Sequence, residues 1–551
     1  MTQAQMNEHN MTDYEAERRS FALDVPADFN WAFDVIDRWA EDPRQEAMFW
    51  VGQGGEERHL SFADFRRRSN QLANALEQLG VRPGDRVFLM LPRVVEWWES
   101  ILGIMKAGAV SMPGTTLLTP KDIVYRSGLA ETRVVITDAA NAAKFDEVRQ
   151  QCPSFEIRIV VGGEREGWTS YETLVGAAGD QRDRLPTPSD GPCMIYFTSG
   201  TVGYPKMVLH THASYPIGHT ITGKYWLDLR PGDLHWNMSE TGWAKAAWSN
   251  LFGPWNMGSS LFIYDGRGKF SARETLEFLQ KYPVTTFCAP PTIYRMLVLE
   301  DLNAYAFPHL RHCVGAGEPL NPEVIDTWRA ATGLTIRDGY GQTESVLLCA
   351  NFPPLEVKPG SMGKPSPGFD VAVVDYDGSV LPPGKEGDIG VRVSPVRPLG
   401  LFKEYWRNPD ATANCMRGDW YITGDRGMMD EDGYFWFVGR ADDVILSAGY
   451  RIGPFEVESA LIEHPAVAEA AVIASPDDLR GEVVKAFVIL APGHAASEIL
   501  AAELQEYVKN STAPYKYPRE IEFVAELPKT ISGKIRRVEL RERERQRKSA
   551  G

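Results

Sequence analysis

A short glycine-rich loop near residue 200 carries several groups that could bind phosphate. Ile195–Thr198 reads as the end of a buried strand, and the loop after it ends at Lys206. Bare backbone N–H groups, hydroxyls and one ammonium in so short a span suit a polyphosphate. The loop is not a Walker A motif, because Pro205 precedes the lysine where that motif has glycine, and a glycine-rich hairpin turn is the alternative. The candidate phosphate ligands are Thr198, Ser199, Gly200, Thr201, Val202, Gly203, Tyr204, Pro205 and Lys206.

A second motif runs from Asp338 to Glu344 and reads DGYGQTE. Its Gly-x-Gly does not continue as a Rossmann fingerprint, because the position that needs the third glycine is Glu344. The motif places an amide, a hydroxyl and a carboxylate at one turn. These groups suit carboxylate positioning, phosphate contact and Mg²⁺ ligation, since Mg²⁺ takes hard oxygen ligands. The alternative is an ordinary polar turn.

Three weaker motifs follow. A tight turn presents Asp425, with Arg440 fifteen residues later, and such a carboxylate could hold two ribose hydroxyls. The charged segment 439–443 leads into a turn at 447–451, and Lys534 follows a glycine near the end of the chain. Taken singly, these motifs also read as a β-turn, a charged linker and a solvated lysine.

The five motifs together, in this order, resemble the adenylate-forming superfamily, which includes acyl- and aryl-CoA synthetases, firefly luciferase and peptide-synthetase adenylation domains. The resemblance spans about residues 30–540. The segments 240–243 and 513–519, with the chain length, are most similar to medium-chain acyl-CoA synthetases. The resemblance implies two half-reactions. A carboxylic acid and MgATP give acyl-AMP and pyrophosphate, and the acyl group then passes to CoA.

The resemblance also implies a role for each site residue. Thr343, Glu344 and Lys534 are the implied catalytic residues, Glu344 is the Mg²⁺ ligand, and Asp442 is the hinge. Besides the phosphate loop, the implied ATP ligands are Gly317, Glu318, Pro319, Asp338, Gly339, Tyr340, Gly341, Gln342, Thr343, Asp425, Arg440, Arg451 and Lys534. The implied acyl pocket comprises Trp243, Gly315, Ala316, Tyr340 and Gly341. The implied CoA ligands are Ala448, Gly449, Tyr450, Arg480, Lys509, Tyr517, Pro518 and Arg519.

The acid itself is not identified by these residues. The tryptophan-rich stretch 226–255 suggests an apolar pocket lined by aromatic rings. Acetate-specific relatives carry tryptophan at the position that Gly341 resembles, so glycine there should leave open space. We therefore expect an acid longer than acetate or propionate, and medium-chain, branched and aryl acids all remain open.

Two other functions fit the same motifs. One is a stand-alone adenylating enzyme that loads a carrier-protein thiol, and the other is a nucleotide-sensing pseudoenzyme scaffold. The basic residues Arg480, Lys509 and Arg519 favour free CoA over a carrier protein. An intact Lys534 and Glu344 argue against a pseudoenzyme.

Alternating strand and helix patterns surround these motifs and predict an α/β fold with largely parallel sheets. Val87–Leu91 reads as a strand and Val94–Ala107 as a helix, whereas the proline- and glycine-rich stretch Pro353–Gly368 reads as a surface connection. Val371–Val374 reads as a further strand, and glycine-bearing turns at 375–379 and 430–433 suggest β-hairpins. The charged tail after Lys534 reads as a solvated amphipathic end. We expect a large N-terminal α/β domain of layered sheets with a β-rich subdomain over residues 1–439. A small mobile α+β domain should follow over 440–551, with its hinge at 440–443.

Composition limits the class of protein. The net charge of −16 over 551 residues argues against nucleic-acid binding, which needs a basic surface. No run of about 18 apolar residues predicts a membrane span, and the polar N-terminus lacks the apolar region of a secretory signal. Six scattered cysteines suit a reducing compartment, and we predict a cytoplasmic protein. His210 and His212 favour packing over a metal pair, and a homodimer is one alternative for the oligomeric state.

Overall fold

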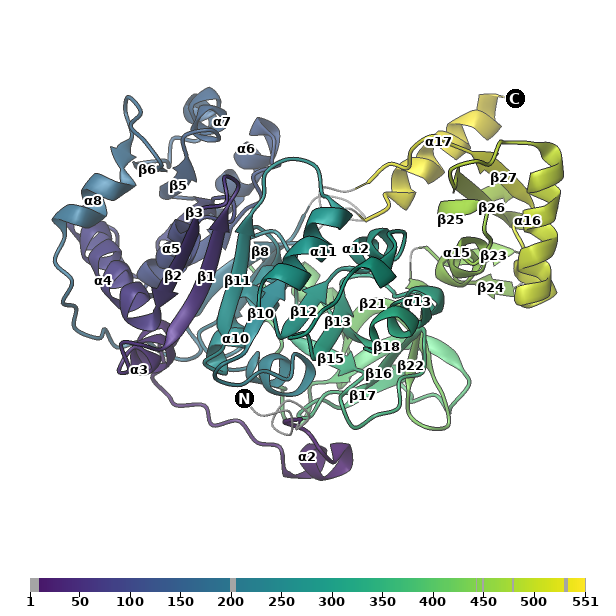
Figure 1. The fold of residues 1–551 in the computed structure, drawn as a ribbon, viewed down its shortest axis with the longest axis horizontal. Coiled ribbons are helices and arrows are strands. Elements are labelled where there is room, and N and C mark those ends of the chain that lie inside the picture. Colours follow the sequence, from purple (N-terminus) through teal and green to yellow (C-terminus); the bar gives the residue numbers. More distant parts are fainter. Residues whose placement is uncertain are drawn as a thin grey trace.

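The computed structural model describes residues 9–198, 205–441, 443–447, 450–477, 480–529 and 534–550, without the side chains of Arg451, Ser549 and Ala550 (Figure 1). Two large sheets use residues up to 440, and a smaller third sheet follows them in the chain. The predicted α/β class, with a large N-terminal domain of layered sheets and a smaller C-terminal domain, is confirmed.

The first sheet carries the phosphate-loop hairpin. Its strands, in spatial order, are β19 (Glu404–Tyr405), β9 (Met207–Thr211), β8 (Pro192–Phe197), β4 (Val110–Pro113), β3 (Arg86–Met90), β5 (Val134–Asp138), β6 (Ile157–Val161) and β7 (Thr169–Ser170). Its helices are α4 (Phe62–Gln78), α5 (Val95–Lys106), α6 (Pro120–Ala130), α7 (Ala142–Glu147) and α8 (Tyr171–Ala177). The strands β4, β3, β5 and β6 are parallel, whereas β8 and β9 form an antiparallel hairpin. The predicted strand and helix at 87–107 are β3 and α5.

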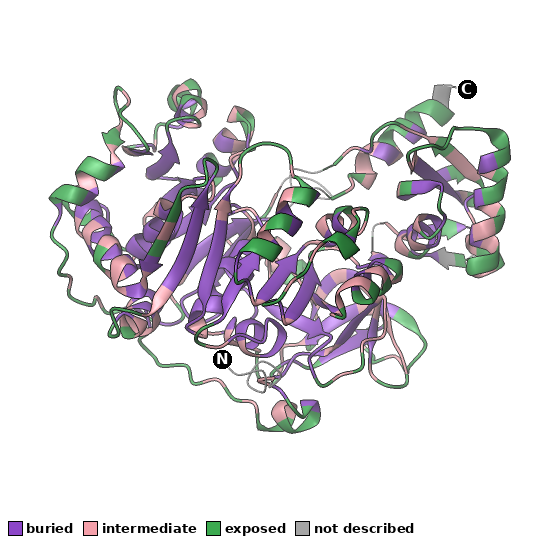
Figure 2. Cartoon of the chain, in the orientation of Figure 1, coloured by how far each residue is buried: buried purple, intermediate pink, exposed green. Residues whose placement is uncertain are grey.

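The second sheet is mostly parallel at one end and antiparallel at the other. Its strands, in spatial order, are β17 (Val371–Val374), β18 (Glu386–Arg392), β21 (Trp420–Met429), β22 (Phe435–Arg440), β16 (Ser361–Pro365), β15 (Leu347–Ala350), β14 (Ile336–Gly341), β13 (His312–Ala316), β12 (Thr286–Ala289), β10 (Leu234–Asn237), β11 (Ser260–Asp265), β1 (Glu46–Gly52) and β2 (Glu57–Ser61), with β20 (Met416–Arg417) beside β21. The helices of this part and of the N-terminal segment are α2 (Tyr14–Ser20), α3 (Asp37–Trp39), α9 (Ala244–Ala247), α10 (Gly253–Asn256), α11 (Ala272–Lys281), α12 (Pro291–Leu297), α13 (Pro322–Thr332) and α14 (Pro409–Asn414). The parallel strands are short and buried, as expected where helices cover a sheet (Figure 2).

The stretch Pro353–Gly368 is not the surface connection that its composition predicted. It contains β16, which pairs with β15 on one side and β22 on the other. Ser361–Gly363 is buried within this strand. Gly363 is needed there, because a Cβ would lie 2.0 Å from the carbonyl carbon of Ala350. The stretch therefore joins the parallel and antiparallel parts of the second sheet.

The third sheet has its own helices and its own core. Its strands, in spatial order, are β24 (Tyr450–Ile452), β23 (Ile445–Ser447), β26 (Gly481–Leu490) and β25 (Val467–Asp477), with β27 (Glu520–Phe523) parallel to β26. Its helices are α15 (Pro454–Ile462), α16 (Glu498–Ser511) and α17 (Arg537–Ala550). The charged tail predicted to be a solvated amphipathic end is α17, and its inner face is buried. Glu544 on that face accepts a 2.6 Å bond from Lys485, and each side chain is only 2% exposed.

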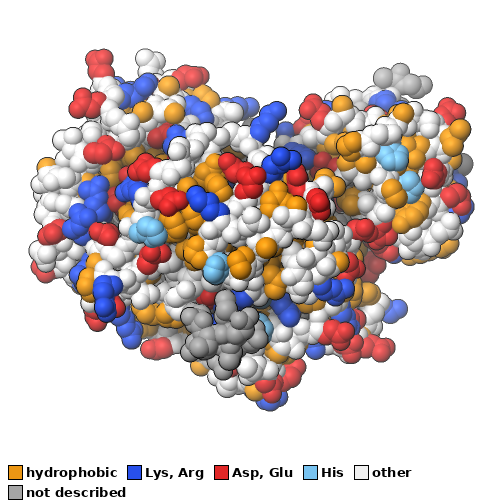
Figure 3. All heavy atoms as spheres, viewed as in Figure 1, with side chains coloured by type: hydrophobic (Ala, Val, Ile, Leu, Met, Phe, Trp, Pro, Cys, Tyr) orange, Lys and Arg blue, Asp and Glu red, His pale blue; other side chains and the backbone are white. Residues whose placement is uncertain are grey.

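No helix among the described residues combines the length and the apolar character needed to cross a bilayer. On the face drawn in Figure 3, acidic and basic side chains are interspersed, without a continuous basic patch. The mixture of charges on this face agrees with the negative net charge of the chain.

Candidate active site

The β8–β9 hairpin positions the two ends of the predicted phosphate loop. Thr198 and Lys206 face each other there: the Thr198 N–H donates to the Lys206 carbonyl, and the Lys206 N–H donates to the Thr198 hydroxyl, both at 3.0 Å. From α6, the Tyr125 hydroxyl donates to the carbonyl of Pro205 at 3.0 Å. Ser199, Gly200, Thr201, Val202, Gly203 and Tyr204 lie outside the described residues.

The predicted adenine segments lie side by side at the ends of β13 and β14. Gly315 pairs with Asp338, and Ala316 pairs with Gly339. Gly317 has a φ of +113°, and a Cβ placed on it would meet nothing within 4 Å. The backbone after β13 therefore borders open space that a flat base could enter, next to Glu318 and Pro319.

Glu318 is held from behind by α12. Its carboxylate accepts from the N–H and hydroxyl of Thr292, and from Arg295 at 3.0 Å. Burial would raise the pKa of Glu318, but Arg295 and Thr292 outweigh that effect and lower it. The opposite holds for Asp338, whose pKa burial raises well above the usual range.

Asp425 lies at the centre of a polar cluster contributed by β14, β21 and β22. One carboxylate oxygen accepts from the Tyr340 hydroxyl at 2.6 Å and from the Gln342 amide at 2.7 Å, and the other accepts from Arg440 at 2.9 Å. Tyr421 donates to the Gln342 carbonyl oxygen at 2.9 Å and so fixes the orientation of that amide. The structure thus brings together the second motif and the predicted ribose residues, which are about 85 positions apart.

Glu344 lies between the phosphate-loop lysine and this cluster. Its Oε1 accepts from the Tyr405 hydroxyl at 2.7 Å, and the Lys206 ammonium lies 4.7 Å from the centre of the Tyr405 ring. Burial raises the pKa of Glu344, and the Tyr405 bond opposes that shift. A single hard carboxylate, with one oxygen held by Tyr405, fits an Mg²⁺ ion that keeps water and substrate phosphates as its other ligands. Among the described residues, no group of three or more His, Cys, Asp and Glu side chains could hold a metal without substrate.

Lys534 reaches this site from the C-terminal domain. Its side chain keeps contact with solvent, yet enough protein surrounds the ammonium for burial to lower its pKa. Glu318 and Asp425 oppose that shift most strongly, and Glu344 contributes. The lysine is therefore within electrostatic range of three predicted site residues that lie between 109 and 216 positions earlier in the chain.

The predicted open space beside Gly341 is filled in the structure, so that part of the acyl-pocket prediction is wrong. A Cβ on Gly341 would lie 2.3 Å from Cη2 of Trp248 and 2.6 Å from the carbonyl oxygen of Val346. The Trp248 ring, not a void, occupies the volume that glycine leaves. Trp243 is partly buried and precedes α9, four residues before the helix ends. Tyr340 faces Asp425 through its hydroxyl.

Part of the predicted CoA set forms one cluster. Lys509 and Arg519 both lie over the ring of Tyr517. The Lys509 Nζ is 5.5 Å and the Arg519 Cζ is 4.9 Å from the ring centre, and Pro518 beside Tyr517 in the chain is buried. Arg480 instead pairs with Asp477 at 3.7 Å and has no described contact with that cluster. Tyr450 is half exposed and stacks on Tyr515 at 4.3 Å. Ala448, Gly449, Asp442 and the side chain of Arg451 lie outside the described residues.

Sequence reasoning missed several side chains that complete the site. The ammonium of the partly buried Lys245 donates to the carbonyl of Ala316 at 2.6 Å, beside the predicted acyl and adenine segments. Tyr405 holds Glu344, and His210 and Tyr215 both donate to the carbonyl of Thr343. These four side chains are far in sequence from the residues that they contact, so no local pattern identifies their roles. His210 and the tryptophan-rich stretch, which contains Lys245, entered the sequence analysis for other reasons.

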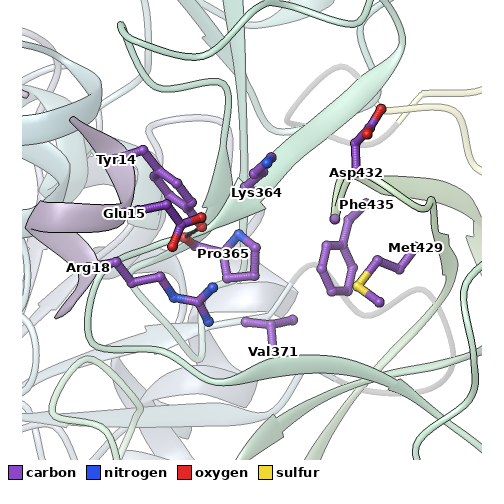
Figure 4. Close-up of a pocket in the computed structure, with 10 residues that line it drawn as sticks. Tyr14, Glu15, Arg18, Lys364, Pro365, Val371, Met429, Asp432 and Phe435 are labelled. Atoms are coloured by element: carbon purple, nitrogen blue, oxygen red, sulfur yellow. Dashed lines mark hydrogen bonds between the residues drawn. The ribbon is translucent and has the colours of Figure 1, made fainter. Parts of the chain in front are cut away.

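A separate hollow of about 260 Å³ lies between α2 and the strands β16, β21 and β22 (Figure 4). Its walls mix Arg18 and Lys364 with Glu15 and Asp432, so it has no single charge. None of the predicted site residues lines it. We therefore place the chemistry at the motif site and not in this hollow.

Comparison with known families gives a consistent result. Residues 36–406 match the family described as AMP-binding enzyme, and residues 456–534 match the AMP-binding enzyme C-terminal domain. The chain is 51% identical over 545 residues to the acyl-coenzyme A synthetase ACSM3, mitochondrial, of Homo sapiens, covering 97% of this chain and 93% of that protein. It is 49% identical over 544 residues to ACSM4, mitochondrial, of Homo sapiens, with 97% and 93% covered.

Solved structures share the fold. An anthranilate CoA ligase in complex with anthranoyl-AMP has a TM-score of 0.88 at 33% identity, covering 95% of this chain and 99% of that one. A benzoate CoA ligase from Burkholderia xenovorans LB400 has a TM-score of 0.82 at 30% identity, covering 93% and 100%.

The predicted cytoplasmic location is wrong by these comparisons, because the similar acyl-coenzyme A synthetases are named as mitochondrial proteins. Scattered free thiols indicate only a reducing environment. They do not distinguish the cytosol from another reducing compartment, and that is why the cysteine argument failed.

The order of the motifs, the clustering of their side chains around Asp425 and Glu344, and the two family matches agree with one another. The chain belongs to the AMP-binding enzyme family, the adenylate-forming enzymes that its five motifs resemble.

Proposed function

We propose that the protein is an AMP-forming acid–CoA ligase that uses ATP, Mg²⁺ and CoA as co-substrates. The observation that carries this proposal is the position of Lys534 near Glu318, Asp425 and Glu344. A lysine from the small domain thus meets the groups that suit a nucleotide and a metal. The acyl-coenzyme A synthetases that are about half identical to the chain support the same activity.

In the first half-reaction, a carboxylate oxygen of the acid attacks the α-phosphorus of ATP. A new P–O bond forms, the bond to the β-phosphate oxygen breaks, and pyrophosphate leaves with the bond electrons. Lys534 lies between the two anions and reduces their repulsion, while Thr343 contacts the α-phosphate. Such preorganised charge stabilises the transition state more than the ground state and thereby lowers the barrier.

Asp425 and Arg440 hold the ribose in this scheme. Asp425 already accepts three hydrogen bonds, from Tyr340, Gln342 and Arg440, and a carboxylate has about four acceptor positions. These three bonds fix the orientation of the Asp425 carboxylate, so its remaining acceptor position has a defined direction and suits a ribose hydroxyl. Glu344 would hold Mg²⁺, which supplies charge neutralisation at the phosphates when bound.

In the second half-reaction, the CoA thiolate attacks the acyl carbon of acyl-AMP, the C–O bond to AMP breaks, and AMP leaves. The thiol proton goes to solvent. Lys509, Tyr517 and Arg519 would hold the CoA nucleotide, since two cations beside an aromatic ring suit its phosphates and base. Ala448, Gly449 and Tyr450 would line the pantetheine path after the small domain rotates about Asp442.

We place the domain boundary at residues 439/440. The separate hydrophobic clusters on either side support it, because the clusters of the third sheet draw only on residues from 445 onward. The acid should be apolar and medium-chain or aryl. Its pocket would be bounded by Trp243, by Tyr340 and by the Trp248 ring against Gly341.

Exchange of labelled pyrophosphate into ATP tests the proposal. Exchange should depend on an apolar acid and not on CoA, whereas thioester formation should need both. An exchange-competent enzyme that ignores CoA but loads a carrier protein would favour the carrier-loading alternative, and no exchange with any acid would overturn the proposal. Light scattering of the same sample decides whether the protein is a homodimer.

A further inference from the structure

Two buried donors converge on a single backbone oxygen inside the adenylation motif. Nε2 of His210 lies 2.8 Å from the carbonyl oxygen of Thr343, and the hydroxyl of Tyr215 lies 2.6 Å from the same oxygen. A carbonyl oxygen only accepts, so both groups donate to it. The two side chains are themselves 0% exposed. His210 lies in β9 and Tyr215 just after it, so this pair of bonds joins the end of β9 to the turn that bears Thr343 and Glu344.

The pair is held rigidly. The His210 and Tyr215 rings stack with centroids 3.3 Å apart and planes 20° from parallel. Nδ1 of His210 lies 3.2 Å from the hydroxyl of Ser214. Because Nε2 carries the proton, Nδ1 accepts from that hydroxyl, and the neutral tautomer is fixed. Burial lowers the pKa of His210 to about 3, so the ring stays neutral at any working pH.

The same tyrosine links this turn to the acyl pocket. The indole N–H of Trp248 lies 3.4 Å from the Tyr215 hydroxyl, and the Trp248 ring fills the space beside Gly341. On the other side of the turn, the Phe402 N–H donates to the Glu344 carbonyl at 2.7 Å. Two successive backbone carbonyls, those of Thr343 and Glu344, are therefore held by hydrogen bonds.

We propose that His210 and Tyr215 are positioning residues for adenylation, which fix the Thr343 carbonyl and thereby aim the Thr343 hydroxyl and the Glu344 carboxylate at the triphosphate. The proposal rests on the proposed function, since it concerns the same site. A turn free to rotate would spread these two groups over several orientations. Errors of about 1 Å in such placement cost about 10²-fold in rate.

The two donors should act together. A carbonyl oxygen has two lone pairs, so it stays satisfied when one donor is removed, but a buried acceptor with no donor carries its full desolvation cost. Tyr215→Phe and His210→Phe each keep a ring for the stack and remove one donor. We expect each single variant to lower kcat for pyrophosphate exchange about tenfold, with KM for ATP and acid within twofold. The double variant should lose more than the product of the two single losses.

Rescue and pH profile separate positioning from a merely structural role. His210→Gln places an amide donor near the position of Nε2 and should recover most of the activity that His210→Phe loses. The shape of the pH profile should be the same in every variant, because His210 exchanges no proton. The matched control is His219→Gln. His219 packs on Tyr215 at 4.7 Å, bonds Thr222 and makes no bond to Thr343, so exchange should stay within twofold.

The wild-type protein serves as the reference for the proposed function. If it catalyses acid-dependent exchange, while the Phe variants retain full kcat or His210→Gln is no better than His210→Phe, the positioning proposal is overturned. A shifted acid limb in His210→Phe would also overturn it, since that result makes His210 a proton-transfer group. If wild type shows no exchange with any acid, the failure belongs to the proposed function and the positioning role falls with it.

Discussion

The bond between Tyr405 and Glu344 should set the lower pH limit of adenylation. In the function proposed above, Glu344 holds Mg²⁺ and must be ionised to do so. Burial already raises the pKa of Glu344 above the usual carboxyl value. The Tyr405 hydroxyl donates to its Oε1 at 2.7 Å and stabilises the ionised form. Tyr405→Phe removes that donor and keeps the ring over which Lys206 lies. The pKa of Glu344 should therefore rise further in the variant.

The size of the effect follows from the charge on the acceptor. A hydrogen bond to a charged group contributes about 1.5–3 kcal/mol, and one pKa unit corresponds to about 1.36 kcal/mol. The acid limb of the exchange profile should thus move up by about one to two pH units. Because Mg²⁺ competes with the proton for the same carboxylate, the displacement should shrink as the Mg²⁺ concentration rises.

The assay is pyrophosphate exchange from pH 5 to 9 at low and at high Mg²⁺, with saturating acid. Tyr421→Phe is the matched control, because it removes a hydroxyl that donates to the neutral Gln342 amide and not to a carboxylate. That variant should lower activity without moving the acid limb. An acid limb in Tyr405→Phe that coincides with wild type at low Mg²⁺ would refute the reasoning.

Three further predictions concern other parts of the chain. Lys534→Ala should slow acyl-AMP formation by about 10²–10³ but leave thioester formation from supplied acyl-AMP nearly intact; equal losses in both steps would contradict the assignment. Gly341→Ala should destabilise the protein by about 1–3 kcal/mol through overpacking, whereas Gly315→Ala, whose Cβ would have its nearest neighbour at 3.6 Å, should not; thermal unfolding compares them. Burial would raise the pKa of Glu544, but Arg547, Lys485 and Ser475 outweigh it and hold it at about 2. A carboxyl group whose pKa is lower in the folded than in the unfolded protein stabilises the fold at pH values above the unfolded pKa. That stabilisation is lost as the pH falls toward the folded pKa of about 2. Lys485→Met removes one of the groups that lower this pKa, so acid unfolding, followed by circular dichroism, should begin at a higher pH in the variant.

Local sequence patterns were sufficient for elements whose apolar residues are continuous. The run Val371–Val374 predicts β17 with its observed bounds, and the helical spacing at 94–107 predicts α5 to within a residue at each end. The turns at 375–379 and 430–433 join antiparallel strands, as their glycines predicted. In each of these cases the decisive interactions are local or run along one face of the element.

Composition misled where long-range contacts decide the outcome. Prolines and glycines at 353–368 predict a loop, but pairing with the preceding strand β15 and with the distant strand β22 makes β16. The empty space inferred at Gly341 is filled by Trp248, which lies 93 positions earlier in the chain. Likewise, no local pattern predicts that Tyr405 lies on Glu344, 61 positions away. Motif spacing identifies which groups take part, whereas their supporting partners are fixed only by the tertiary fold.

The uneven distribution of tryptophan has a consequence for how this protein can be observed. The sequence contains 15 tryptophans, the last of them is Trp436, and the third sheet begins after it. The hydrophobic clusters of that sheet are separate from those of the other two. Intrinsic tryptophan emission therefore reports on the large domain alone, whereas backbone circular dichroism reports on both. Denaturation curves from the two probes should diverge wherever the domains unfold independently, so coincidence of the curves would measure how tightly the small domain is coupled to the large one.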